Sequence, residues 1–196
     1  MINSMISKYL LPILFLLIIL ISCVDNLENK RIEKVIETSK LMIIRGDSIM
    51  KVNNMVKVYM QIDGEYLKIN DSISFPNKID NIIKISEESQ PIVYVEQSIS
   101  ESGDWNNIYI HYFDTQGKLI AFVRNSSFFN GICREGVLSE KTMLIYDNEF
   151  NIILEEYELR DESNKLVIDT SDCMFNYRYN YEVYKLYKNV PLKPLN

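Results

Sequence analysis

Phe113-Asp114-Thr115-Gln116-Gly117-Lys118-Leu119-Ile120 lies past the middle of the chain and reads as an aromatic residue, an Asp, a short polar turn and a return into aliphatic residues. An Asp followed by a short polar stretch between two apolar runs is typical of a turn. The flanking stretches 105–113 and 118–124 are rich in β-branched and aromatic residues, which favour strands. The stretch therefore predicts a β-hairpin.

The same sequence pattern occurs twice more toward the C-terminus. Tyr146-Asp147-Asn148-Glu149-Phe150-Asn151-Ile152-Ile153 repeats it, and the segment from Asp161 to Val167 repeats it again. Upstream, alternation of apolar and polar residues predicts a strand over 56–62, and Asp63-Gly64 is a two-residue hairpin turn. Consecutive hairpins predict an antiparallel β-meander, with further strands at 65–69, 92–95, 143–147, 152–159 and 165–168.

Helices are expected before the meander. Residues 25–42 carry apolar side chains at helical spacing with charged residues elsewhere, and Gly46-Asp47 is expected to break the chain after them. A second helix is expected to begin at Ser74-Phe75-Pro76, although a strand is the alternative over 79–86 because Ile is β-branched. The predicted fold class is α+β, with an N-terminal helix or helices packed on a mainly antiparallel β-meander sheet.

The N-terminal residues have the form of a processing signal. An apolar run over 10–21 ends in Leu20-Ile21-Ser22-Cys23, which resembles the lipobox of bacterial lipoproteins. A spanning helix needs about 20 apolar residues, whereas a shorter run is typical of a signal peptide. We therefore expect cleavage of residues 1–22, lipid on Cys23, and a single domain over 23–196; an uncleaved anchor helix is the alternative.

The chain has three cysteines. If Cys23 carries lipid, Cys133 and Cys173 remain as an even pair in an oxidising compartment, which predicts a disulfide between them. Two separate buried thiols are the alternative. Neither cysteine has the nearby Cys or His of a zinc site, so no metal is expected there.

The charge of the chain disfavours some partners. Its formal net charge is −6, and loss of residues 1–22, whose only charged residue is Lys8, makes it −7. Nucleic acids and anionic lipid surfaces both require a cationic footprint, so nucleic acid is not an expected partner.

Catalytic and cofactor motifs are sparse. His111 is the only histidine, which excludes His-pair metal sites and Cys–His pairs, and a lone strand histidine is more often packed than catalytic. The acidic residues between Glu155 and Glu162 fall on alternate faces of a predicted strand, so their carboxylates do not converge on one site. The chain has no phosphate loop and no dinucleotide fingerprint, so no cofactor is expected.

Tyrosines provide the main binding candidate. Residues 175–183 alternate with a period of two, so Tyr177, Tyr179 and Tyr181 share one face of a predicted strand. Rows of this kind can stack on sugars or form a protein interface, because tyrosine offers apolar area with a polar tip. The alternative is a sheet face packed beneath the helices.

A set of short segments in the second half of the chain resembles uncharacterised lipoproteins of the Bacteroidota: Gly103-Asp104-Trp105, Tyr112-Phe113-Asp114, Phe128-Phe129-Asn130, Cys133-Arg134-Glu135-Gly136 and Cys173-Met174-Phe175-Asn176-Tyr177. The resemblance implies a location in the cell envelope and supports pairing of the cysteines. It implies no activity and no functional residue.

Taken together, these patterns predict an outer-membrane lipoprotein, facing the periplasm or the surface, that binds or scaffolds rather than catalyses. The lipid bilayer is its expected partner through acylated Cys23, with an envelope protein or a glycan as ligand. An inhibitor or immunity lipoprotein that neutralises a toxin or enzyme is the alternative, and a carboxylate-based hydrolase is a third hypothesis.

Overall fold

The computed structural model describes residues 2–52, 56–69, 81–86, 90–100, 102–129, 135–168 and 181–191. These residues form one α-helix, α1 (Ile2–Ile49), and one eight-stranded sheet. The chain divides into two compact units, Met1–Thr38 and Ser39–Asn196, so the boundary falls inside α1. The first unit is helical throughout its described part, and the second contains the last turns of α1 and the whole sheet.

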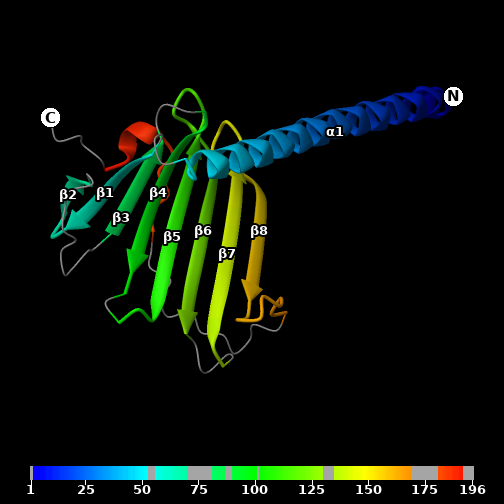
Figure 1. Ribbon diagram of the computed structural model, residues 1–196. Coiled ribbons are helices and arrows are strands. Elements are labelled where there is room, and N and C mark those ends of the chain that lie inside the picture. The colour runs from blue at the N-terminus through cyan, green and yellow to red at the C-terminus, as the bar shows by residue number, and fades with distance from the viewer. Residues whose placement is uncertain are drawn as a thin grey trace. The chain divides into compact units, whose positions relative to one another are not determined.

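Every neighbouring pair of strands in the sheet is antiparallel, and the order is β2-β1-β3-β4-β5-β6-β7-β8. Figure 1 shows the strands side by side in this order. From β3 onward the strands follow one another as a meander, which was predicted from residue 92 onward, while β1 lies between β2 and β3. The strands are β1 (Lys57–Ile62), β2 (Glu65–Lys68), β3 (Asn81–Ser86), β4 (Ile92–Ile99), β5 (Trp105–Phe113), β6 (Leu119–Phe129), β7 (Val137–Tyr146) and β8 (Ile152–Arg160).

The repeated turns share one geometry. Asp114 Oδ1 accepts the backbone N–H of Gln116 and of Lys118 at 2.8 Å, Asp147 Oδ1 accepts those of Glu149 and Asn151, and Asp161 Oδ1 accepts that of Lys165. The third residue after each Asp has positive φ, at 75° for Gly117, 66° for Phe150 and 62° for Asn164. The three turns expected from the sequence are therefore confirmed in their hydrogen bonds. The strand predicted over 165–168 is wrong, because these residues form only one isolated bridge, between Leu166 and Arg160.

The last turns of α1 pack on one face of the sheet, which we call the helix face. Asp47 Oδ1 accepts a hydrogen bond of 2.6 Å from the Tyr112 hydroxyl, and Lys40 Nζ forms an ion pair of 2.7 Å with Glu156. A Cβ atom at Gly46 would lie 2.9 Å from side-chain atoms of Tyr112 and Val93. The prediction that Gly46-Asp47 breaks the chain is wrong, because this glycine serves close packing inside a helix.

The predicted limits of the N-terminal helix are also wrong. The sequence suggested a start at Asp25 and an end near Met42, whereas α1 runs without interruption from Ile2 to Ile49. A capping pattern at Asp25 does not start a helix when helix-forming residues precede it, because no backbone N–H there lacks a partner in the preceding turn. The described part of the chain contains this single α-helix, so the fold is mainly β with a helix.

Residues 81–86, for which a helix was expected, form strand β3 instead. Ile83 and Ile85 are buried and Lys84 between them is exposed, which is the alternation of a strand. The alternative drawn from the β-branched isoleucines is therefore correct, and residues 74–80 lie outside the described part. Tertiary pairing with β1 and β4 decides the conformation of this ambiguous apolar run.

The other sheet face is covered in part by the C-terminal segment, residues 181–191, and we call it the segment face. The segment is red in Figure 1 and ends in a 3₁₀ helix, η2 (Tyr187–Asn189). Its backbone is fixed to the β5–β6 turn, where Tyr187 N–H donates to Gly117 O at 2.8 Å and Leu119 N–H donates to Lys185 O at 3.0 Å. The predicted strand over 175–183 is wrong for residues 181–183, which have no regular structure, and residues 175–180 lie outside the described part.

Candidate functional site

A polar hollow of about 330 Å³ lies on the sheet over strands β5 to β8. Strand register places most of its lining side chains on the helix face, in the halves of these strands away from Tyr112. Ile108 is the only aliphatic member of the lining. The helix-face residues of the hollow are Asn106, Ile108, Asn125, Ser127, Ser139, Lys141, Glu158 and Arg160; Ser126 and Glu140 also line it.

The charged groups of the hollow are unevenly paired. Arg160 donates from Nε to Glu158 Oε2 at 3.0 Å and from Nη1 to Asn164 O at 3.1 Å, so its guanidinium is held in place. Lys141 stands directly across from Glu158 in the register, yet within the described part of the chain it has no ion pair. The hollow therefore presents one exposed, uncompensated ammonium group on a protein whose net charge is negative.

The neutral lining groups both donate and accept hydrogen bonds. Asn125, Ser127 and Ser139 have no side-chain hydrogen bond with any described residue, and Asn106 uses its Oδ1 to accept from Gln97 at 3.1 Å. The strands that carry these four residues, β5, β6 and β7, are each paired on both sides, so a ligand at these residues would be held by side chains. Amides and hydroxyls of this kind suit a ligand that itself carries hydroxyls or amides.

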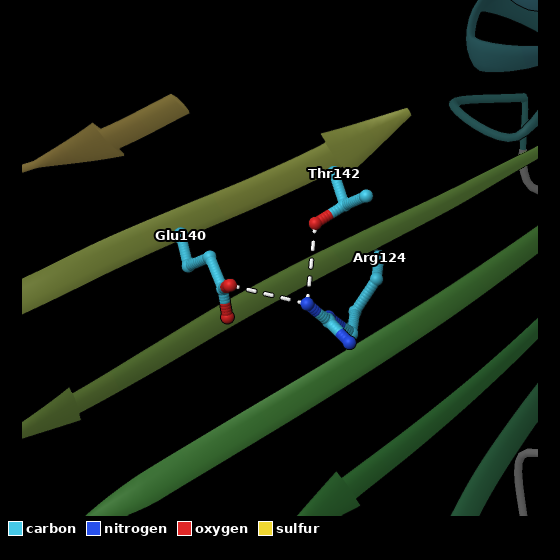
Figure 2. Close-up of polar contacts among 3 residues, drawn as sticks. All are labelled: Arg124, Glu140 and Thr142. Carbon is cyan, nitrogen blue, oxygen red and sulfur yellow. Dashed lines mark hydrogen bonds and ion pairs between the residues drawn. The ribbon is translucent and has the colours of Figure 1, made fainter. Parts of the chain in front are cut away.

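A buried ion pair lies behind the hollow on the segment face. Figure 2 shows Arg124 of β6 pointing toward Glu140 and Thr142 of β7, with Nη2 donating to Glu140 Oε1 at 3.1 Å and to Thr142 Oγ1 at 3.2 Å. The Glu140 side chain is 1% exposed. Because Ser139 and Lys141 flank Glu140 on the same strand, this pair fixes the part of β7 that faces the hollow.

The tyrosines predicted as a binding face are only partly within the described chain. Tyr181 is described, and its ring stacks on Tyr109 with centroids 3.7 Å apart, while its hydroxyl donates to Glu96 Oε2 at 2.9 Å. Tyr94 donates to the same oxygen at 3.1 Å. Burial, reinforced by Glu96, raises the pKa of Tyr181 far above its ordinary value. Tyr181 is therefore partly buried and packs against the aromatic core of the segment face, and Tyr177 and Tyr179 lie outside the described part.

His111 is buried in the same aromatic cluster. Its Nε2 accepts the backbone N–H of Tyr184 at 3.3 Å, and Nδ1 has no partner among the described residues. Burial lowers the pKa of His111 to about 3, so the ring is neutral at physiological pH. A neutral histidine without access to solvent packs the C-terminal segment and does not transfer protons to a ligand in the hollow.

The other predicted site residues remain predictions. Cys23 lies within the range of α1 but its side chain is outside the described part, and Cys133 and Cys173 are outside it as well. Among the described residues, no three His, Cys, Asp or Glu side chains are arranged to hold a metal ion. The acidic group of β8 is divided between partners, with Glu156 bound to Lys40 and Glu158 bound to Arg160.

The sequence reasoning missed the hollow, although a signal for it exists. On the helix face, β5 to β7 change from apolar to polar residues at nearly the same level. Ile110, Val123 and Met143 form one cross-strand row, and Ile108, Asn125 and Lys141 form the next. This change becomes visible only after the strands are aligned by their register.

No protein-family model, no curated protein and no solved structure matches this chain. Within the described residues, no helix combines the length and the apolar character needed to cross a membrane.

Proposed function

We propose that this chain is a lipid-anchored envelope lipoprotein whose sheet domain binds a ligand or partner at the polar hollow without catalysing a reaction. The observation that carries the proposal is a hollow over four strands in which Asn125, Ser127 and Ser139 make no side-chain hydrogen bond with any described residue. Beside them lies Lys141, which has no ion pair within the described part of the chain. Polar side chains that converge in a concave surface are the usual feature of a recognition site.

The anchoring half of the proposal rests on Leu20-Ile21-Ser22-Cys23. Two or more acyl chains hold a protein stably on a bilayer, because each buried methylene contributes about 0.8 kcal/mol. Growing the native host with an alkyne-bearing fatty acid should label the wild-type protein and leave Cys23→Ser unlabelled. An unlabelled wild-type protein would refute anchoring through this cysteine.

The pairing of the described carboxylates near the hollow supports the binding half. His111 is sealed in the core, and the carboxylates nearest the hollow, Glu158 and Glu140, are each paired with an arginine. General acid–base catalysis requires a titrating group within reach of the substrate. Turnover by the purified protein in a broad hydrolase screen, lost on Glu158→Gln, would overturn a purely binding role.

Site-specific crosslinking tests the hollow directly. A photoreactive amino acid at exposed Ser139, on the rim of the hollow, should capture a partner or ligand on intact cells of the native host. The same amino acid at exposed Lys188, on the C-terminal segment, is the matched control. Equal capture from both positions would place the binding surface elsewhere, and capture of a toxin or hydrolase at Ser139 would favour the inhibitor hypothesis.

A further inference from the structure

The hollow also restricts the chemistry of its ligand, and this inference rests on the function proposed above. Asn106, Asn125, Ser127 and Ser139 supply groups that both donate and accept hydrogen bonds. A saccharide hydroxyl likewise donates and accepts, so it can satisfy such groups in either direction. A peptide bound over these four residues would find no free backbone group beneath it, because β5, β6 and β7 are each paired on both sides, while β8 is the edge strand of the sheet and pairs with β7.

The apolar part of the lining suits the same ligand. Ile108 lies in the cross-strand row with Asn125 and Lys141, so an aliphatic surface is bordered by polar side chains. A sugar ring has C–H surface as well as hydroxyl edges, and a site of this mixed kind can contact both. The volume of about 330 Å³ is near the lower limit of small-molecule sites, about 300–1,000 Å³, which suits one or two sugar units.

The charge pattern adds a requirement for an anion. Glu158 and Arg160 neutralise each other at 2.9 Å, whereas Lys141 in the same helix-face lining has no ion pair with any residue that the structure describes. An ammonium group bound to a carboxylate forms a charge-assisted hydrogen bond, which is stronger than a neutral one. A neutral sugar would leave Lys141 with water alone.

We propose that the polar hollow binds a saccharide carrying a carboxylate, with Lys141 contacting the carboxylate and the asparagine and serine side chains contacting the hydroxyls. Lys141 is then the residue that sets specificity for acidic over neutral sugars. The attraction decreases as salt rises, because both charges are partly exposed to solvent.

Matched ligands test the inference on the full-length chain in a polyoxyethylene detergent, which carries no sugar. The probes are methyl glucuronide and methyl galacturonide against methyl glucoside and methyl galactoside, each pair differing at one carbon, with affinities measured by saturation-transfer NMR titration. We expect the wild type to prefer the acidic members about tenfold, the ratio of one charge-assisted hydrogen bond.

Two lysine variants separate a specific contact from general attraction. Lys141→Gln should reduce the preference to about one while the unfolding midpoint stays unchanged, because this side chain is exposed and unpaired. Lys188→Gln removes another exposed positive charge, outside the hollow, and should leave the tenfold preference intact. An equal loss in both variants would overturn the assignment to Lys141.

The outcomes also separate this inference from the proposed function. Equal affinity for acidic and neutral probes overturns the anion requirement. Absence of binding to all four probes, with crosslinking at Ser139 retained, overturns the saccharide class and leaves the binding function standing. If no probe binds and crosslinking at Ser139 also fails, both the saccharide site and the binding function at the hollow are overturned.

Discussion

Acidification from about pH 7.5 to about pH 5 should destabilise this protein through His111. The folded state holds the pKa of His111 at about 3 because burial disfavours the charged ring, whereas in the unfolded chain the value is the ordinary 6.5. Between these two values the unfolded state binds more protons than the folded state, so stability rises with pH across this window. Acidification therefore lowers the free energy of unfolding.

The size of the effect follows from the window. Below pH 6.5 the loss accumulates at about 1.4 kcal/mol per pH unit, so about 2 kcal/mol is lost by pH 5. The chain has no second histidine. The prediction is therefore confined to one side chain.

Urea denaturation of the wild type and of His111→Gln at both pH values measures the effect. Glutamine does not titrate, and its side-chain oxygen can still accept the N–H of Tyr184. The variant should be less stable than the wild type at pH 7.5, and the gap should narrow by about 2 kcal/mol at pH 5. A gap that does not change between the two pH values would refute the assignment of a buried, neutral His111.

Three substitutions test other parts of the fold by urea denaturation. Gly46→Ala should lower the free energy of unfolding by about 1–2 kcal/mol, because the clash with Tyr112 and Val93 outweighs the higher helix propensity of alanine. The control Thr38→Ala, at an exposed position of the same helix, should change it by no more than about 0.5 kcal/mol. Tyr181→Phe should lower the free energy of unfolding by about 1–3 kcal/mol, because the hydrogen bond to Glu96 is lost. An unchanged free energy of unfolding would show that this hydrogen bond does not stabilise the fold. Asn164 has a φ of 62°, so Asn164→Gly should leave the free energy of unfolding unchanged or raise it, and Asn164→Val should lower it by about 1 kcal/mol or more. Equal effects of the two substitutions would contradict the turn geometry.

The meander was predictable because its information is local. Each of the three repeated turns is fixed by an Asp whose carboxylate accepts backbone N–H groups within the next four residues. The residue with positive φ differs among the three turns, and Phe150 occupies this position with Lys185 over its ring at 5.5 Å. The Asp is therefore the reliable signal, while the expected Gly is present only at Gly117.

Other features depend on contacts between distant segments. Gly46 looks like a helix break until the rings and methyl groups that approach it are known. Tyr181 looks like a member of an exposed row, yet it stacks on Tyr109, 72 positions earlier in the chain. Residues 81–86 have no local preference that excludes a helix, and pairing on both sides makes them a strand. In each case the competing structures are close in local energy, and tertiary packing selects one.

The hollow shows how much further a sequence can be interpreted once the register is known. Along β5 to β7 the helix-face positions change from Ile110, Val123 and Met143 to a row that contains Asn125 and Lys141. Val123 and Met143 are buried, whereas Lys141 is exposed. A uniformly covered sheet would keep apolar residues along the whole length of this face, and a uniformly exposed one would have few of them. The change within each strand therefore marks the limit of the covered area, and the polar row beyond it is the surface that is free to bind.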